Sequence, residues 1–310
     1  MTGFLIKRLL AGIATLFVIA TLCFVIQRTA PGSPLTTDRN LPPEVLMNMK
    51  RAHHLDKPLA VQYLLRMQGY LRGDLGFSLK YNRPVEDYLA PALPVSLQLG
   101  ALTIVFTLLV GLAAGVAAAA RQNRPLDHAA MSLALLGICV PNFLMGPLLI
   151  MVFSLWLGWL PVAGWPESFA PAELAKLVLP VLTLSFVHIA YVSRLSRAGM
   201  LDVLGRDYIR TARAKGLDET AVVLRHGLKN GVTPVVSYAG PMAAYVLTGS
   251  VVVERIFNIP GLGNHFVDSA LSRDYDIFLG CMLIYSVLVI GLNLLADVAY
   301  SLLDPRVRLA

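Results

Sequence analysis

The sequence is poor in charged residues. Only 15% of its 310 residues are Asp, Glu, Lys or Arg, whereas 56% are hydrophobic and the mean hydropathy is +0.65. A soluble domain carries about 25% charged residues and about 45–50% apolar residues. The composition therefore indicates an integral membrane protein. The net charge of +7 does not point to nucleic acid, because Lys and Arg accumulate in the cytoplasmic loops of membrane proteins.

Cysteine is equally scarce, with three residues in the whole chain. Cys23, Cys139 and Cys281 each fall in a separate apolar run, far from the others. This spacing fits neither a disulfide framework nor a zinc-type site. We therefore expect the three cysteines to be small buried residues, and we predict no metal site in this chain.

Several catalytic motifs are missing from the sequence. There is no G-x-x-x-x-G-K-[ST] phosphate loop and no Gly-Lys dipeptide, so the chain is not expected to hydrolyse ATP. A G-x-S-x-G motif, an H-E-x-x-H motif and paired aspartates within an apolar run are also missing, which argues against an intramembrane hydrolase. The adjacent His53 and His54 have no i,i+4 partner, and we interpret them as surface residues. No catalytic residue is predicted.

What the sequence does contain is a set of long apolar runs. A helix needs about 20 apolar residues to cross about 30 Å of hydrocarbon. Pro141, Gly146 and Pro147 interrupt the third run, but the set as a whole predicts an all-α integral membrane protein with six transmembrane helices. The first of them is expected to be retained rather than cleaved as a signal peptide. The six uncharged runs are Leu9–Ile26, Val95–Ala120, Met131–Leu157, Leu177–Ser193, Gly231–Val253 and Ile277–Ala296.

Lys and Arg set the expected orientation of these helices. If both termini face the cytoplasm, the short outer loops contribute only Lys176, Arg255 and Arg273 to the positive charge. Positive residues concentrate in cytoplasmic loops, so we predict cytoplasmic N- and C-termini. The expected parts are residues 1–30 with the first span, an extracytoplasmic helical loop at 31–94, and a core domain with five spans at 95–310.

The inner loop at about 202–230 contains the basic stretch RTARAKGLDE. Tyr208–Lys215 is rich in Ala and Arg, which favour helix, and Gly216 suits a helix C-terminus. Asp218 is then placed to cap a second helix through Ala221–Leu228. The sequence predicts a short helix-turn-helix at the inner face of the membrane.

Ala212 and Ala214 are the small residues of this loop, and Arg213 and Lys215 follow them directly. Small side chains permit the close approach of another surface, and the charges can fix its register. One interpretation is therefore a knob that docks into a groove of a partner protein. An interfacial helix whose cations bind lipid headgroups explains the same residues, and the residue chemistry alone leaves both interpretations open.

The order of residues in this loop resembles that of a known family. The stretch YIRTARAKGLDETAVVLRHGLKNGVTPVV is similar to the cytoplasmic EAA loop of permease subunits from binding-protein-dependent ABC importers. Gly216, Leu228 and Ala212 match the Gly, the Leu and the second Ala of that loop. Arg210 and Thr211 replace its Glu and its first Ala, which is typical of the peptide/nickel branch of the family.

The resemblance extends over nearly the whole chain. The stretches FLIKRLLAGIATLFVIATLCFVIQRTAPGSP, GDLGFSLKYNRPV, FNIPGLGNHFVDSALSRDYD and DPRVR are similar to segments of the same branch. Lys229 departs from the Pro that many family members have, again as in this branch. Within the branch the chain is most similar to the B subunits of oligopeptide permeases. Dipeptide, glutathione and nickel permeases are the alternatives that the resemblance leaves open.

The resemblance implies a type I ABC importer permease fold in the bacterial inner membrane, with residues 95–310 as the core permease domain. It also implies a second, C-type permease subunit, two cytoplasmic ATPases that bind ATP and Mg²⁺, and an extracytoplasmic peptide-binding protein. This chain would form half of the translocation pathway, in contact with lipid, and would bind neither a cofactor nor nucleic acid. The residues that would couple it to an ATPase are Arg210, Thr211, Ala212, Arg213, Ala214, Lys215, Gly216 and Leu217.

Polar residues inside spans are costly in lipid and often line a pathway. The candidates are Ser185, His188, Ser237, Tyr238, Thr248 and Ser250. A local interpretation stays open, because Ser and Thr often bond to their own helix and a single His usually pairs with a neighbour. No Asp or Glu lies in the middle of a span, and Glu254 and Asp297 are expected at membrane interfaces. This argues against a proton-coupled secondary transporter, which is the remaining alternative.

Overall fold

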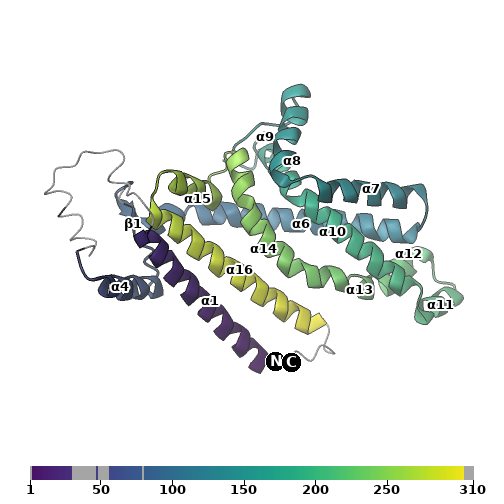
Figure 1. Cartoon of the computed structure of the whole chain (residues 1–310). Helices are drawn as coiled ribbons and strands as arrows, with labels where there is room; N and C mark the ends of the chain where they lie inside the picture. Colours follow the sequence, from purple (N-terminus) through teal and green to yellow (C-terminus); the bar gives the residue numbers. More distant parts are fainter. Residues whose placement is uncertain (1, 30–46, 48–55, 79, 304–310) are drawn as a thin grey trace. The chain divides into compact units, whose positions relative to one another are not determined.

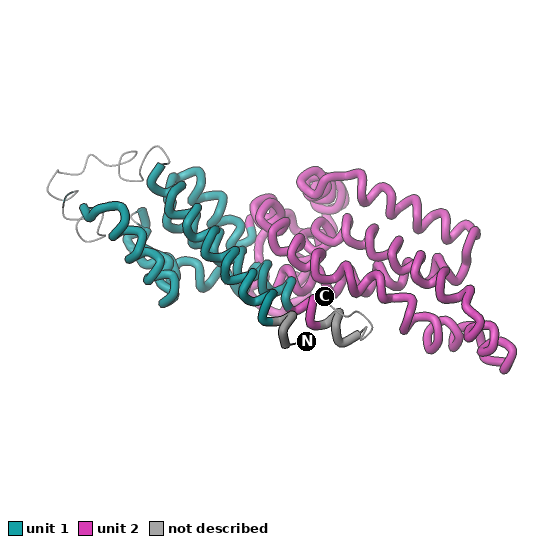
Figure 2. The backbone as a smooth tube through the Cα atoms, turned by 60° about the horizontal axis from the view of Figure 1, so that its bottom comes forward, with its two compact units in different colours: residues 1–97, 259–294, 309–310 teal, residues 98–258, 295–308 magenta. Residues whose placement is uncertain are grey.

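The computed structural model describes residues 2–29, 47, 56–78 and 80–303, whose course is shown in Figure 1. The chain divides into two compact units, which Figure 2 colours separately: residues 1–97 with 259–294, and residues 98–258 with 295–308. Helices α6 (Ala92–Ala120) and α16 (Tyr275–Leu303) contribute residues to both units. The expected surface positions of His53 and His54, and the segment DPRVR, lie outside the described residues.

Five helical segments of the described chain are long and apolar enough to cross a membrane. They confirm five of the six predicted spans as continuous helices. Four of them begin and end within a few residues of the predicted apolar run, whereas the segment predicted as Leu177–Ser193 extends to Leu204. The first two segments are Ile6–Thr29 in α1 (Thr2–Thr29) and Ala92–Ala120 in α6. The third, Pro171–Leu204, comprises α9 (Pro171–Leu174), η2 (Ala175–Leu177) and α10 (Val178–Leu204). The last two are α14 (Thr233–Ile256) and Tyr275–Val298 in α16.

The third predicted span is not a single helix. Helix α7 (Pro125–Cys139) ends, and α8 (Asn142–Leu149) with the π-helical η1 (Ile150–Trp156) leaves it at a bend of 109°. The ring of a proline disfavours the helical conformation of the preceding residue, and Val140 before Pro141 is accordingly extended, with ψ 117°. The prediction of one helix through Met131–Leu157 is therefore wrong. The described chain has a sixth span only if this bent pair counts as one.

Helix α10 forms the centre of the second unit. It contacts α7, α8, α14 and the short helix α13 (Leu228–Gly231). Half of the residues in the most apolar part of the span Pro171–Leu204 are buried. A Cβ added at Gly115 of α6 would lie 2.4 Å from the carbonyl oxygen of Ser193 in α10, so the two backbones are in direct contact. Glycine permits this close approach between membrane helices. The basic stretch RTARAKGLDE follows α10 closely in the chain.

The first unit contains a small group of short elements besides its spans. Helix α4 (Leu59–Leu71) precedes a two-stranded antiparallel hairpin, in which β1 (Phe77–Ser78) pairs with β2 (Arg83–Pro84) and Phe77 lies opposite Pro84. The short helices α5 and α15 belong to the same unit, and their bounds are Val85–Leu89 and Leu262–Leu271. Helix α4 lies within the helical loop that was expected at 31–94, whereas the hairpin was not anticipated.

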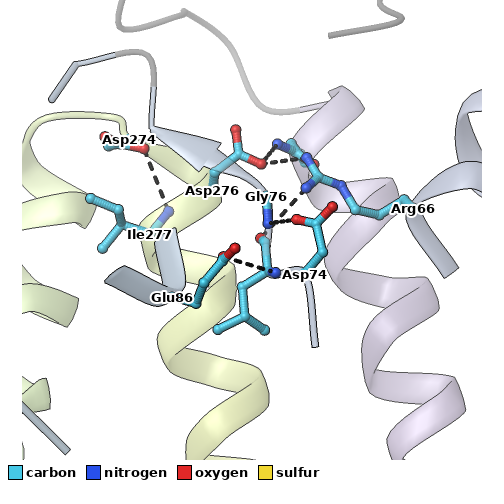
Figure 3. A network of polar contacts seen from close by, with 9 residues as sticks. Arg66, Asp74, Gly76, Glu86, Asp274, Asp276 and Ile277 are labelled. Atoms are coloured by element: carbon cyan, nitrogen blue, oxygen red, sulfur yellow. Dashed lines mark hydrogen bonds and ion pairs between the residues drawn. The ribbon is translucent and has the colours of Figure 1, made fainter. Parts of the chain in front are cut away.

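A polar network ties α4 and the hairpin to the start of α16 (Figure 3). Arg66 of α4 forms an ion pair with Asp276 in the first turn of α16, and Gln27 Nε2 donates to the same carboxylate at 3.0 Å. Within the connecting loop, the Asp74 carboxylate accepts from Gly76 N at 2.8 Å. Burial would lower the pKa of the Arg66 guanidinium, but Asp276, Tyr70 and Asp74 together outweigh burial and raise it. This arrangement keeps Arg66 charged and the loop ordered.

In the same network, Asp274 links the hairpin to the first turn of α16. The Ser78 hydroxyl of β1 donates to its carboxylate at 2.5 Å, and Ile277 N points to the same group at 3.5 Å. Burial raises the pKa of Asp274, and the Ser78 hydrogen bond only partly offsets that effect. An aspartate at this position caps the helix that follows, so the hairpin and α16 share one anchor.

The cysteines follow the prediction at two of three positions. Cys23 and Cys281 are buried, as expected. Cys139 is exposed, which corrects the expectation for this residue. It is the last residue of α7, where the chain turns away before Pro141 and no other described segment covers the helix end.

Candidate coupling site and translocation pathway

The basic loop folds as the predicted helix-turn-helix, and Gly216 ends its first helix. Helix α11 (Asp207–Ala214) closes with two backbone hydrogen bonds, from Gly216 N to Arg213 O at 2.9 Å and from Leu217 N to Ala212 O at 3.4 Å. This pair of bonds is the Schellman motif, which needs a left-handed residue after the helix. Gly216 supplies it with φ +80°, and the space around its Cα is open.

Asp218 caps the second helix, as predicted. Its carboxylate accepts from Thr220 N at 3.0 Å, and the helical segment continues through α12 (Glu219–Ala221), η3 (Val222–Gly227) and α13 to Gly231. The central six residues are π-helical, a wider turn that is frequent at functional sites. Nothing in the sequence distinguishes a π turn from an α turn here, so this feature was missed.

An ion pair joins the two helices across the turn. Arg213 Nε and Nη2 donate to the two carboxylate oxygens of Glu219 at 3.0 and 2.7 Å, which is a bidentate arrangement. These hydrogen bonds raise the pKa of Arg213 and lower that of Glu219. Both side chains are exposed, so the pair contributes little to stability. Sequence reasoning treated Arg213 as a charge for a partner, but in this structure it is engaged within the loop.

The inner side of the loop is apolar and buried. Ile209 and Ala212 of α11 pack with Val203 of α10 and Val222 of η3. Ala212 was predicted to face a partner, yet only 6% of it is exposed. The expectation for Ala212 is therefore corrected: its small size serves the close packing of the loop on itself.

Other residues of the loop are exposed, and we call a set of eight of them the docking surface. It carries two cations, Arg210 and Lys215, next to half-exposed apolar side chains that sequence reasoning did not single out. Leu224 in the π turn is the most exposed of these, at 54%. The full set is Tyr208, Arg210, Thr211, Ala214, Lys215, Gly216, Leu217 and Leu224. Cations around a few apolar side chains can bind a protein groove as well as a lipid headgroup layer.

The loop is attached firmly to the spans. Met200 of α10 is fully buried against Val223 of η3 and Ala119 of α6. A Cβ added at Gly231 would lie 2.4 Å from the Met200 sulfur, so the end of the second helix also touches α10. The second helix of the loop and α10 are thus joined by packed side chains.

A second ion pair fixes α10 to the start of α7. Arg197 Nε and Nη2 donate to the two oxygens of Asp127 at 2.6 and 2.7 Å, and Asn123 N donates to the same carboxylate at 2.9 Å. The Asp127 carboxylate is buried, whereas a quarter of the Arg197 side chain is exposed. The sequence did not point to this pair, because the two residues lie 70 positions apart in the chain.

Two of the predicted pathway residues come together between α10 and α14. His188 Nδ1 lies 2.9 Å from the Tyr238 hydroxyl, and the Tyr245 ring meets the His188 ring edge-on at 5.0 Å. Tyr191 lies 5.6 Å from Tyr238, measured between ring centroids. We call these four residues the tyrosine–histidine cluster. Sequence reasoning missed Tyr191 and Tyr245, which spacing by three and seven residues from His188 and Tyr238 places on the same helix faces.

The other pathway candidates are engaged locally. Ser237 and Thr248 are exposed, and their hydroxyls donate to carbonyls of their own helix, at 3.2 Å to Thr233 and 3.1 Å to Ala244. Ser250 is fully buried and bonds to Leu247 O at 2.7 Å.

Two further polar residues of the spans are buried. Ser185 is enclosed against α6, where its hydroxyl lies 3.5 Å from Thr103 O. Ser185 and Ser250 are thus both buried and hydrogen-bonded to backbone carbonyls, and their place in the pathway stays a prediction. Glu254, expected at a membrane interface, is also fully buried, because the end of α14 is covered by neighbouring segments.

Comparison with known proteins identifies the family. Residues 111–309 match the family described as "Binding-protein-dependent transport system inner membrane component", and residues 1–100 match "Binding-prot-dependent transport system membrane comp, N-term". Together the two matches cover almost the whole chain.

Full-length relatives agree with the family match. The chain is 40% identical over 309 residues to the "Oligopeptide transport system permease protein OppB" of Haemophilus influenzae and 41% identical to that of Escherichia coli K12, covering 99% of this chain and 100% of either relative. It is 43% identical over 310 residues to the "Dipeptide transport system permease protein DppB" of Bacillus subtilis, covering 100% of this chain and 99% of the relative.

A solved structure supports the fold. The "Crystal structure of an amino acid ABC transporter with histidines" superposes with a TM-score of 0.50 at 18% identity, covering 71% of this chain and 94% of that chain. This likeness speaks for the all-α membrane permease fold alone. Taken with the matches along the sequence and the apolar spans, it shows that the chain belongs to the inner membrane components of binding-protein-dependent transport systems, as a multi-pass permease.

Proposed function

We propose that this chain is a permease subunit of an ATP-driven oligopeptide importer and that it forms half of the translocation pathway. The observation that carries the proposal is the similarity to oligopeptide permeases along the whole length of both proteins. A dipeptide importer is the second candidate, because the dipeptide permease of Bacillus subtilis is similarly related to this chain.

The proposed assembly contains a second, homologous permease subunit, two cytoplasmic ATPases that bind ATP and Mg²⁺, and an extracytoplasmic peptide-binding protein. Family membership supports ATPase and binding-protein partners in general terms. The missing phosphate loop supports the assignment of ATP hydrolysis to partner subunits, with no cofactor bound by this chain.

In this proposal the docking surface contacts an ATPase in the cytoplasm, where both termini also lie. The surface is exposed, its cations are Arg210 and Lys215, and Gly216 and Asp218 hold its two helices in a defined geometry. An interfacial lipid contact explains the cations but does not explain the firm packing of Val223 on Met200. That packing suits a loop that receives and transmits force.

The proposed mechanism follows from this attachment. Closure of the ATPases on ATP would move the docking surface, and the buried contacts of Met200 and Ile209 would carry the motion to α10. The Arg197–Asp127 ion pair would carry it on to α7. Rocking of these helices would open the pathway alternately to the two sides of the membrane.

The test is peptide uptake by cells or proteoliposomes that contain the assembled transporter. We expect labelled tetra-alanine to accumulate in the presence of ATP, with uptake lost on ATP depletion and retained when the proton gradient is collapsed. Preferential uptake of dialanine over tetra-alanine would favour the dipeptide candidate. Uptake that follows the proton gradient instead would contradict the proposal and point to a secondary transporter.

A further inference from the structure

The exposed residues of α14 lie on one stripe. Ser237, Pro241, Tyr245, Thr248 and Val252 follow one another at intervals of three or four residues, which places them on one face of the helix. Polar side chains in a span rarely face lipid. Tight helix pairs in membranes, for their part, prefer small residues at the contact, and a tyrosine at the middle of the stripe does not suit such a contact. This face has the composition expected of a surface that lines an aqueous path.

The tyrosine–histidine cluster stands at the centre of this stripe. Tyr245 is 54% exposed and Tyr191 is 40% exposed, whereas His188 beneath them is 3% exposed. Tyr238 connects the layers, because it is close to Tyr191 and its hydroxyl contacts His188 Nδ1. The rings of Tyr191 and Tyr245 are therefore exposed, and they pack on the hydrogen-bonded pair of His188 and Tyr238.

One buried ring nitrogen of this cluster lacks a hydrogen bond. His188 Nε2 is buried and has no hydrogen-bond partner among the residues that the structure describes. A buried polar atom without a partner is unfavourable, and in native proteins such atoms commonly mark a place for a ligand or a water molecule. Because the imidazole lies directly against the Tyr245 ring, a group that displaces this ring would gain access to Nε2.

The chemistry of the cluster suits a peptide of variable sequence. Tyrosine offers a large rigid ring with a polar tip, and it gives contact area to many partners at a small loss of side-chain freedom. The constant part of peptide cargo is its backbone, with one carbonyl acceptor and, except at proline, one N–H donor per residue. Tyrosine hydroxyls and an imidazole nitrogen can pair with both kinds of group and read no side chain.

We propose that the tyrosine–histidine cluster of α10 and α14 is a contact site for the backbone of the peptide cargo, with Tyr191 and Tyr245 touching the peptide and His188 positioning the rings through Tyr238. The assignment rests on the proposed function as a peptide permease and adds to it a defined contact site. A lipid acyl chain or a helix of the second permease subunit would be the alternative occupant of the same face.

The first experiment is photo-cross-linking in the assembled transporter. The substitution Tyr245→p-benzoylphenylalanine and the control Leu109→p-benzoylphenylalanine, on an exposed residue of α6, are irradiated during ATP-driven uptake of tritiated tetra-alanine. We expect a radioactive adduct at position 245 at least fivefold above position 109. Adducts of position 245 with a permease subunit or with lipid, and no radioactive peptide adduct, would overturn the assignment.

The second experiment separates a cargo contact from a structural role. Tyr245→Ala, Tyr245→Phe and His188→Phe are expected to raise the KM for tetra-alanine uptake about five- to tenfold with little change in kcat, because Tyr245→Phe removes the hydroxyl that would bond to the peptide backbone. Tyr245→Phe keeps the ring and should leave the Tm unchanged, so a KM equal to that of the parent protein in this variant would indicate a packing role and overturn the assignment. A lowered Tm with an unchanged KM would overturn the assignment.

The two experiments also distinguish the site from the function. If the parent transporter takes up tetra-alanine but neither the adduct nor the KM change is found, the cluster is not a cargo site and the proposed function stands. If the parent transporter takes up neither tetra-alanine nor dialanine, the proposed function itself is overturned and the site assignment falls with it.

Discussion

At the scale of single residues, Gly216 determines the geometry of the turn in the basic loop. Its φ of +80° costs any residue with a Cβ about 1–2 kcal/mol, and its open surroundings leave the way free for a partner. We expect Gly216→Glu to abolish peptide uptake while membrane insertion, followed by immunoblotting of membranes, stays normal. The strain weakens the turn, and the added carboxylate stands within the docking surface.

Gly158 offers a matched control for this substitution. It has φ +65° and no neighbour within 4 Å of an added Cβ, but it lies in the loop after η1, far along the chain from the docking surface. Gly158→Glu should therefore introduce similar backbone strain and leave uptake largely intact. Normal peptide-stimulated ATPase activity and uptake in Gly216→Glu would contradict the docking role of the loop.

The two alanines of the loop should respond in opposite ways. Ala212 is buried among Ile209, Val203 and Val222, so Ala212→Leu overpacks a small core and should cost about 1–3 kcal/mol of stability. Ala214 is exposed, so Ala214→Leu should leave the Tm unchanged and reduce binding-protein-stimulated ATPase activity severalfold. Thermal unfolding in detergent and ATPase assays of the assembled complex measure both. Equal effects on Tm would show that the two positions are not distinguished by burial.

At the scale of helices, the Asp127–Arg197 ion pair should matter far more than a surface pair. Asp127→Asn leaves a half-buried guanidinium with a weaker partner, and breaking a buried pair is strongly destabilising. We expect a Tm lowered by several degrees, together with weaker coupling of ATP hydrolysis to uptake. The control is Asp202→Asn, which breaks the exposed pair with Arg206 and should change neither quantity. A Tm equal to that of the control would contradict the proposed anchoring of α10 to α7.

The sequence predicted the helices of this protein better than their contacts. Apolar runs predicted five spans, four of them within a few residues, and local rules predicted the turn at Gly216 and the cap at Asp218, because each depends on neighbours in the chain. The break between Cys139 and Asn142 was visible as Pro141, but the size of the bend depends on packing. The π turn at Val222–Gly227 has no local signature.

The contacts that build the candidate sites could not be read from the chain. Asp127 pairs with Arg197 and His188 with Tyr238 over separations of 70 and 50 residues. Periodicity shows which residues share a helix face but not which helices face one another. Ala212 was assigned to the docking surface for the same reason: its small size fits an internal contact as well as an external one.

At the scale of the whole molecule, the orientation in the membrane can be tested directly. In a background with its three cysteines replaced by alanine, Leu71→Cys and Lys215→Cys place single thiols on exposed positions of α4 and the docking surface. We expect an impermeant maleimide to label Leu71→Cys in spheroplasts and to label Lys215→Cys only after the membrane is opened. The reverse pattern would place the docking surface outside and separate it from any cytoplasmic ATPase.

Helix α10 runs without a break for 27 residues, with Leu179 near one end and Met200 near the other. At 1.5 Å per residue this is a rod of about 40 Å. If the helix rotates by about 7° about a point near one end, its other end moves by roughly 5 Å, which is close to one helical pitch. In the proposed mechanism, a small displacement of the basic loop would therefore become a larger movement at the other end of α10, without a hinge inside the helix.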